Sequence, residues 1–414
     1  MDPQSELKPK LRNVEPIHLA VNGRTVVGLK DPLQLKDQVV CLQPEALPVV
    51  AMMDGRHSLR DIQVELTRRT GRLVFLDDIK AVVKVLEEAF LLEGEYFREA
   101  FANKVAEYRC KPFRPASHAG ISYSADSQTL QAELRNFFVA ENGPGMPELY
   151  SDARRPVGLI APHIDIRAGG KCFAAGYHAL AQGQPSDVYV IFGTGHAGVQ
   201  QIFTATTLDF QTPLGMVETD RELVQELSQM LSCDIAAEEI LHGAEHVIEF
   251  QAIFLQYMFS GRHAFKIVPV LCSLSHRLFD DEGALNQDRE FFDRFCNAMR
   301  ETCRRSSQSV CFVASADLDH IGPRYGDQFI PHNGTVRESL EKDRQLLRCL
   351  ELVDLHGFIQ GVAKENDARR ICGFSPITAM LSCMEASQGK LLSLDHARVD
   401  DQNSFVSFTS MIFH

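Results

Sequence analysis

The sequence predicts an α/β protein in which a large α/β sandwich follows a small α+β module. From about residue 118 onward, uniformly apolar runs of strand length alternate with segments of helical periodicity. Strands without polar alternation are typical of a sheet that is covered on both faces. The Pro-containing segment KPFRPASHAG, from Lys111 to Gly120, interrupts the pattern. We therefore expect two domains, at 1–110 and 111–414.

The first 110 residues predict strands followed by short amphipathic helices. The dipeptide Asn22-Gly23 is a turn signal between two short strands. Ser58 and Asp61 have the spacing of a capping box, which predicts the start of a helix, and another helix begins near Asp77. This order favours a winged-helix-like unit.

The second part contains four apolar runs that predict buried strands and three segments that predict helices. The strand runs are VGLIAP at 157–162, DVYVIFG at 187–193, FKIVPVLCS at 265–273 and SVCFVAS at 309–315. The helical segments are RELVQELSQML at 221–231, EFQAIFLQYM at 249–258 and REFFDRFCNAM at 289–299. Their alternation predicts a largely parallel sheet with helices on both faces.

Composition excludes several classes of protein. The formal net charge of -13 argues against nucleic-acid binding, which needs clustered Lys and Arg. No apolar run approaches the roughly 20 residues that span a bilayer, and no secretory signal is present, so we expect a cytoplasmic protein that does not bind membranes. The 11 cysteines form no CxxC pairs, which argues against a disulfide framework or a zinc ribbon.

Polar side chains follow three of the predicted strands. His163 lies in APHIDIRAGG, His196 lies in FGTGHAG, and ASADLDHIG contains Asp317, Asp319 and His320. Ligand sites in open α/β sheets lie beyond the carboxyl ends of the strands. Two imidazoles and one carboxylate there are typical of non-haem Fe(II). A lone histidine is more often a loop or core residue, so the metal and structural interpretations remain about equally open at this point.

His246, Cys372 and Asp317 each have both a functional and a structural interpretation. Glu245 and His246 in GAEHVIEF precede a predicted helix, where His246 either packs in the first turn or acts as an acid/base or supporting group. Cys372 in ICGFSPI is more typical of a buried structural thiol. Asp317 either orients a metal ligand or forms a local Asx turn.

Seven stretches in consistent order resemble the Memo family, the protein B component of the AmmeMemoRadiSam grouping. They are PASHAGISYSADSQTLQAEL, GLIAPHIDIRAGG, FGTGHAG, TPLGMVETD, AEHVIEFQAIFLQ, ASADLDHIGPRYG and CGFSPI. That family is similar in fold to the class III extradiol dioxygenases. In the first module, MDGRHSLRDIQVEL and LEEAFLL resemble the PqqD-type winged-helix modules, which bind peptides.

The resemblance implies a set of site residues. His163 and His196 match the family's metal-binding histidines, and His246 matches a further active-site histidine. The family's cysteine ligand falls on Asp319, and His320 beside it is a second candidate for proton transfer. A carboxylate in place of a thiolate favours Fe(II), with copper or zinc as other metals. Asp317, Glu245 and Cys372 are expected to support the site or bind substrate.

The resemblance also implies a function. We expect a metal-dependent oxidoreductase or dioxygenase of the non-haem iron type, acting on a peptide or a small molecule. The grouping implies partners, a radical-SAM protein and an AMMECR1-like protein, to which the first module could deliver a peptide. The alternative is a non-catalytic binding or scaffold protein that retains a dioxygenase-like cleft, because a fold does not fix a function.

Overall fold

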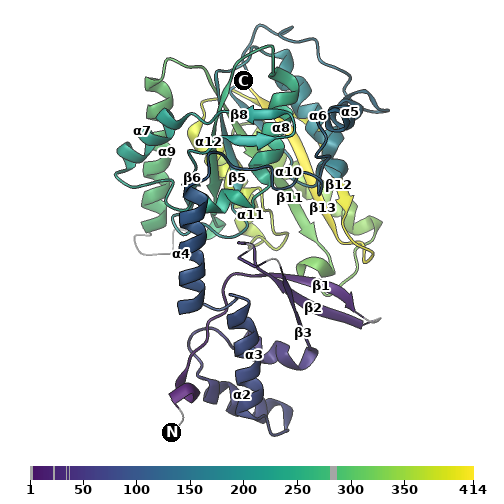
Figure 1. Ribbon diagram of the computed structural model, residues 1–414. Helices are drawn as coiled ribbons and strands as arrows, with labels where there is room; N and C mark the ends of the chain where they lie inside the picture. Colours follow the sequence, from purple (N-terminus) through teal and green to yellow (C-terminus); the bar gives the residue numbers. More distant parts are fainter. Residues whose placement is uncertain (1–2, 22–23, 34, 37, 280–286) are drawn as a thin grey trace. The chain divides into compact units, whose positions relative to one another are not determined.

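The chain divides into two units, residues 1–111 and residues 112–414. A computed structural model describes residues 3–21, 24–33, 35–36, 38–279 and 287–414 (Figure 1). The predicted turn at Asn22-Gly23 lies outside the described residues. Each unit buries its own cluster of apolar side chains.

Unit 1 is a small α+β module in which a sheet precedes the helices. Its antiparallel sheet has the order β1-β2-β3. The capping box is present at the start of α2, because Ser58 Oγ accepts from the Asp61 N–H at 3.1 Å and the Asp61 carboxylate accepts from the Ser58 N–H at 2.9 Å. Ile62, Ile79 and Leu86 are fully buried beneath the helices. The elements are β1 (Glu15–Val21), β2 (Arg24–Lys30), β3 (Val39–Leu42), α1 (Leu47–Ala51), α2 (Leu59–Thr70), α3 (Leu76–Glu88) and α4 (Glu95–Arg109).

Unit 2 is built on a mixed sheet that has eight strands among the described residues. The order is β11-β13-β4-β10-β5-β9-β6, and β12 pairs with β13. The strands are β4 (Gly158–Ala161), β5 (Val188–Thr194), β6 (Phe203–Ala205), β9 (Lys266–Cys272), β10 (Val310–Ser315), β11 (Asp317–Ile321), β12 (Gly389–Arg398) and β13 (Phe405–Phe413), with a separate pair β7 (Phe210–Thr212) and β8 (Gly215–Val217). The helices are α5 (Ser127–Val139), α6 (Ile166–Gln182), α7 (Arg221–Leu231), α8 (Val247–Phe259), α9 (Gln287–Arg305), α10 (Asn333–Glu351), α11 (Leu355–Lys364) and α12 (Phe374–Cys383).

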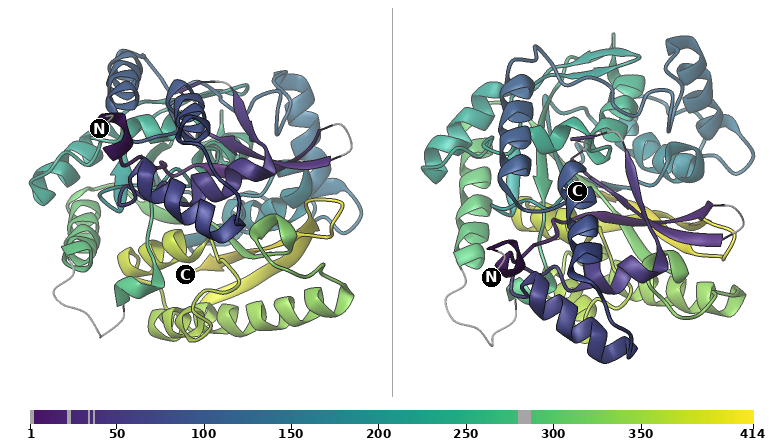
Figure 2. Two further views of the ribbon diagram at one scale, coloured as in Figure 1. Left: turned by 90° about the horizontal axis from the view of Figure 1, so that it is seen from below. Right: turned by 60° about the horizontal axis from the view of Figure 1, so that its bottom comes forward.

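Helices cover both faces of this sheet (Figures 1 and 2). On one face α6 and α8 pack against the central strands, where the rings of Phe173 and Phe254 stack at 4.7 Å. On the other face α12 packs against β10 and β5, and Phe192 stacks on Phe312 at 6.3 Å. Apolar side chains on both faces explain why the strand runs lack polar alternation. The predicted α/β class is confirmed.

Among the described residues, none of the helices is both long and apolar enough to cross a bilayer.

The register of three parallel strands determines where the polar loops meet. β10 lies between β4 and β5, and Ser315 at its end pairs with Ala161 on one side and Gly193 on the other. All three strands run in the same direction, so their carboxyl ends share one edge of the sheet. The segments after Ala161, Gly193 and Ser315 therefore begin side by side.

Candidate metal centre

Two histidines and a cysteine from three separate segments meet at this edge. His163 follows β4, His196 follows β5, and Cys372 lies directly before Gly373, the residue that caps α12. One potential ligand atom from each of the three lies within 4.8 Å of the others. A tetrahedral site with bonds of about 2.0–2.3 Å separates ligand atoms by roughly 3.3–3.8 Å, so this cluster is close to the spacing that a metal requires.

The ring of His163 is fixed by its backbone surroundings. Its Nδ1 lies 2.9 Å from the carbonyl oxygen of Ser315, to which it donates in the neutral ring, and its own backbone N–H donates to Asp317 Oδ1 at 2.9 Å. Its Nε2 lies 3.0 Å from Cys372 Sγ. A donating Nδ1 leaves the Nε2 lone pair free, which is the tautomer that a metal ligand needs.

Glu245 orients two further imidazoles. Its Oε1 lies 3.1 Å from Nδ1 of His196 and 3.1 Å from Nδ1 of His246, and its Oε2 accepts from the His196 backbone N–H at 3.0 Å. These three residues form a second group whose ligand atoms lie within 4.8 Å of one another. Since one carboxylate accepts from both Nδ1 atoms, Glu245 is better placed to direct both Nε2 atoms than to act as a ligand itself.

Gly373 allows the Cys372 segment to approach the strand ends. Its N–H donates to the carbonyl oxygen of Asp317 at 2.9 Å, and Thr194 Oγ1 donates to the carbonyl oxygen of Cys372 at 2.8 Å. A Cβ atom on Gly373 would lie 2.4 Å from that Asp317 oxygen, which no side chain tolerates without a backbone shift. A glycine directly after Cys372 is therefore needed for this close approach.

Burial and neighbouring charges shift the pKa values of the cluster. Burial raises the pKa of Asp317 to about 7 and also raises the pKa of the Cys372 thiol. Burial, together with the nearby His196 and His246, lowers the pKa of His163 well below its usual value. Burial opposes charge on both Glu245 and His196, but their mutual attraction is stronger, so the pKa of Glu245 is lowered and that of His196 is raised.

Asp319 does not join the cluster, so its prediction as the third ligand is corrected. Its Oδ1 is 2.6 Å from Arg369 Nη1 and its Oδ2 accepts from Ser339 Oγ at 2.5 Å, in a fully buried position. Cys372, predicted only as a supporting or structural residue, takes the place beside the histidines. The pairing of β11 with β13 shifts register between Asp317 and His320, and such irregularities change which face a side chain occupies.

The remaining predicted residue, His320, lies close to the cluster without being part of either group. Its Nδ1 is 3.0 Å from the carbonyl oxygen of Leu318, its ring lies edge-on to Tyr325, and burial lowers its pKa to about 4.

His118 is a further histidine near the cluster that was not predicted individually, although it lies in the SHAG stretch. Its ring centroid is 5.3 Å from that of His246, and its Nε2 is 3.1 Å from the carbonyl oxygen of Ala244.

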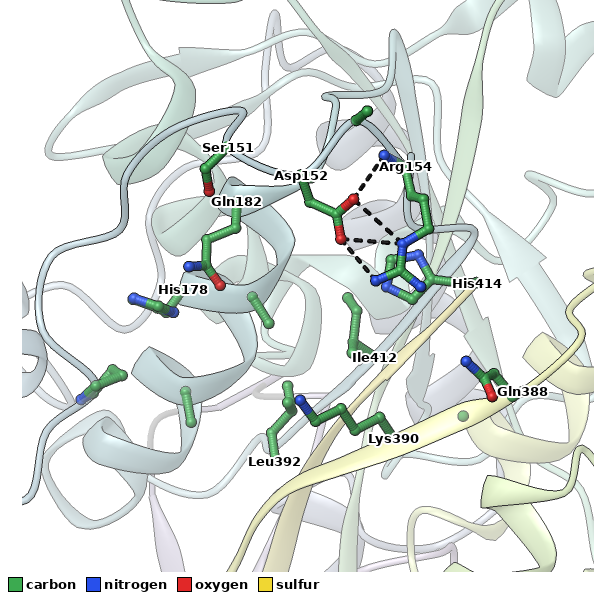
Figure 3. Close-up of a pocket in the computed structure, with 16 residues that line it drawn as sticks. Ser151, Asp152, Arg154, His178, Gln182, Gln388, Lys390, Leu392, Ile412 and His414 are labelled. Atoms are coloured by element: carbon green, nitrogen blue, oxygen red, sulfur yellow. Dashed lines mark hydrogen bonds and ion pairs between the residues drawn. The ribbon is translucent and has the colours of Figure 1, made fainter.

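A separate cavity of about 670 Å³ lies at the opposite edge of the sheet. Ile412, which lines it, pairs with Leu159 near the start of β4, whereas His163 follows the end of that strand. Figure 3 shows the ion pair of Asp152 with Arg154 at this cavity, with His178 and Lys390 also lining it. None of the predicted site residues lines this cavity, so it is distinct from the candidate metal centre.

The donor set fits a metal ion. Two imidazole nitrogens and one thiolate are ligands that zinc, copper and iron sites use in proteins, and the thiolate favours the softer ions. The fold and this cluster together define an α/β protein with a candidate metal centre at the carboxyl edge of its parallel strands.

The chain belongs to the Memo-like protein family, whose model matches residues 114–412. A MEMO1 family protein of Aquifex aeolicus is 28% identical over 417 residues, which cover 99% of this chain and all of the relative. MEMO1 family proteins of Methanosarcina barkeri and Methanopyrus kandleri are 27% and 29% identical, over 72% of this chain and 99% and 98% of their own lengths.

Proposed function

We propose that this chain is a metal-dependent oxidoreductase whose metal is held by His163, His196 and Cys372. The observation that supports the proposal is the placement of three ligand atoms, from three segments far apart in sequence, within 4.8 Å of one another. His163 is buried, Cys372 is half-buried and His196 is exposed, so the cluster lies at the surface end of the strands, where an ion could reach it.

The identity of the metal follows from the donors. The expectation of Fe(II) depended on a carboxylate at Asp319, which is engaged with Arg369 instead. A thiolate with two imidazoles favours Cu(I) or Zn(II) over Fe(II). When bound, the metal would supply Lewis acidity and, in the case of copper or iron, a one-electron couple.

The surrounding side chains would handle protons. His246 is 28% exposed and its Nδ1 is held by Glu245, which directs Nε2 away from that carboxylate as an acid/base group. Asp317 lies 3.7 Å from His163 Nε2 through its Oδ2, so it would balance charge beside that ligand. His320 is a supporting group in this proposal because burial keeps it neutral near pH 7.

Metal analysis tests the proposal. Protein that has been stripped of metal and then reloaded anaerobically with Cu(I), Zn(II) or Fe(II) should bind one equivalent of at least one of them. His163→Ala and Cys372→Ser should each lower the affinity at least about tenfold. The matched controls are His356→Ala and Cys110→Ser, which change exposed residues. Wild-type affinity in both site variants would refute the metal centre.

Turnover is tested separately. Loaded protein should oxidise a peptide or small-molecule substrate, and His246→Gln should slow that reaction while metal affinity is retained. A loaded centre without any turnover would leave the alternative of a non-catalytic metal-binding protein.

The partners are a further part of the proposal. We infer from the family grouping that a radical-SAM protein and an AMMECR1-like protein act with this chain, and that unit 1 receives a peptide. A pull-down with residues 1–111 should capture the partner or peptide, and binding that needs only residues 112–414 would remove this role.

A further inference from the structure

Cys372 lies in a turn that is held in an unusual backbone conformation. The turn, residues 365–373, joins α11 to α12. Asn366, Asp367 and Arg370 have φ angles of 49°, 49° and 55°, in the left-handed region that residues other than glycine rarely adopt. Three such residues in one short turn persist only where surrounding contacts impose the conformation.

Arg369 supplies contacts of that kind. Its Nη1 donates to Asp319 Oδ1 at 2.6 Å and to Asp343 Oδ1 at 2.7 Å, and its Nε donates to Glu365 Oε2 at 2.8 Å. Its carbonyl oxygen accepts from the His320 N–H at 2.8 Å. The side chain is only 9% exposed and both aspartates are fully buried. One planar guanidinium thus connects the turn to two carboxylates outside it, Asp319 and Asp343, and also binds Glu365 within the turn.

The carboxylates of Asp319 and Asp343 are themselves held by side chains of regular elements. Ser339 of α10 donates to Asp319 Oδ2 at 2.5 Å, and Ser407 of β13 donates to Asp343 Oδ2 at 2.6 Å. The Asp319 N–H in β11 donates to the same Ser407 Oγ at 2.9 Å. The contacts of Arg369 with Asp319 and Asp343 therefore connect the turn to β11 and to α10, both of which lie outside it.

We propose that Arg369, through its buried contacts with Asp319 and Asp343, is a positioning residue that holds the 365–373 turn so that Cys372 Sγ lies beside His163 Nε2. Asp319 therefore affects the position of Cys372 indirectly, through its ion pair with Arg369. The inference rests on the proposed metal centre for its effect on metal affinity, whereas the position of the thiol is a property of the metal-free chain.

The first experiment uses metal-free protein and needs no metal binding. Alkylation of Cys372 by iodoacetamide is followed by peptide mass spectrometry, with the exposed Cys110 in the same sample as the internal standard. Arg369→Met should raise the rate at Cys372 several-fold relative to Cys110, because the released turn exposes the thiol. Arg369→Lys, which keeps the charge but loses the planar fork, should give an intermediate rate.

The second experiment uses Co(II) as a probe of the thiolate ligand. Wild-type protein loaded with Co(II) should show a thiolate-to-cobalt charge-transfer band. Arg369→Met should lose most of that band, as Cys372→Ser should, and should bind Co(II) about 10- to 100-fold more weakly. The matched control is Arg12→Met, which removes a buried arginine paired with Asp31 in unit 1 and should leave the band intact.

A second variant guards against a failure to fold. The double variant Arg369→Met/Asp343→Asn also removes one of the two buried aspartates that lose their cation. Fewer buried charges are then left without a partner, which favours folding, while the guanidinium contacts remain absent. This double variant should show the same fast alkylation and the same weak band. A variant without Arg369 that unfolds cooperatively, yet keeps the wild-type alkylation rate and band, would overturn the inference. If wild-type protein binds no metal, the proposed function fails, and the alkylation result still decides the role of Arg369.

Discussion

His242 is a buried histidine that illustrates how a single residue links folding to pH. It is 1% exposed, its Nε2 lies 3.2 Å from the carbonyl oxygen of Thr204, and burial lowers its pKa to about 3. In the unfolded chain a histidine has a pKa near 6.5. Between these two values the unfolded state binds more protons, so the stabilising contribution is full above about pH 6.5 and is lost as the pH falls.

The His242→Gln variant tests this linkage. Glutamine can still donate to Thr204 but does not titrate. Between pH 7 and pH 5, the wild-type free energy of unfolding should fall by about 2 kcal/mol more than that of the variant. Denaturant unfolding at each pH measures the difference, with His356→Gln on the exposed side of α11 as control. Equal pH dependence in wild type and His242→Gln would mean that folding does not lower the pKa of His242.

The ligand residues show how much of the candidate site can be predicted from the sequence. His163 and His196 could be predicted because both directly follow apolar strand runs whose carboxyl ends meet. Cys372 follows a turn instead of a strand, so no periodic pattern singled it out. Asp319 was expected as a ligand because it matches the family's cysteine position, and its pairing with Arg369, a residue 50 positions away, is a long-range contact that no sequence pattern shows.

At the scale of elements, a buried ion pair connects the start of unit 2 to α8. The guanidinium of Arg114 contacts the carboxylate of Glu249, and both side chains are fully buried. Arg114 also donates to the carbonyl oxygens of His242 and Glu245 at 2.9 and 2.7 Å. Glu249 accepts from the His118 N–H at 3.0 Å. The pair therefore holds the 114–118 segment against the residues that lead into α8.

Removal of Arg114 should be costly. Arg114→Met leaves Glu249 buried without its cation, which should lower the free energy of unfolding by about 3–5 kcal/mol. Adding Glu249→Gln should recover part of that loss, since the uncompensated charge is gone. The control is Arg221→Met, whose half-exposed pair with Asp209 should contribute less than about 1 kcal/mol. A loss in Arg114→Met no larger than in the control would contradict the structural role of the pair.

The elements themselves were largely readable from the sequence. The segment 249–258 lies within α8, and the run at 309–315 contains β10, because uniform burial leaves a clear apolar signature. The long hairpin of β12 and β13 was not predicted. β12 is mostly half-exposed and pairs only with β13, whereas β13 is buried throughout and also pairs with β11 and β4, which a sequence pattern does not show.

At the scale of the whole molecule, the two units have separate hydrophobic cores. The family model begins at residue 114, three residues beyond the end of unit 1. All the proposed metal ligands and every contact of Arg369 described above lie in unit 2. Each unit buries enough apolar side chains to form its own core. The metal centre should therefore not require unit 1.

Expression of the two units as separate chains tests this independence. Residues 112–414 should unfold cooperatively and bind metal with the affinity of the full chain, because Arg114 and all of the ligands are retained. Residues 1–111 should fold on their own and bind no metal at this site. Calorimetry measures the unfolding of each chain, and titration measures metal affinity before and after the chains are mixed. If residues 112–414 lose metal affinity about tenfold and recover it when unit 1 is added, the metal centre depends on both units, and the expected independence of the two units is wrong.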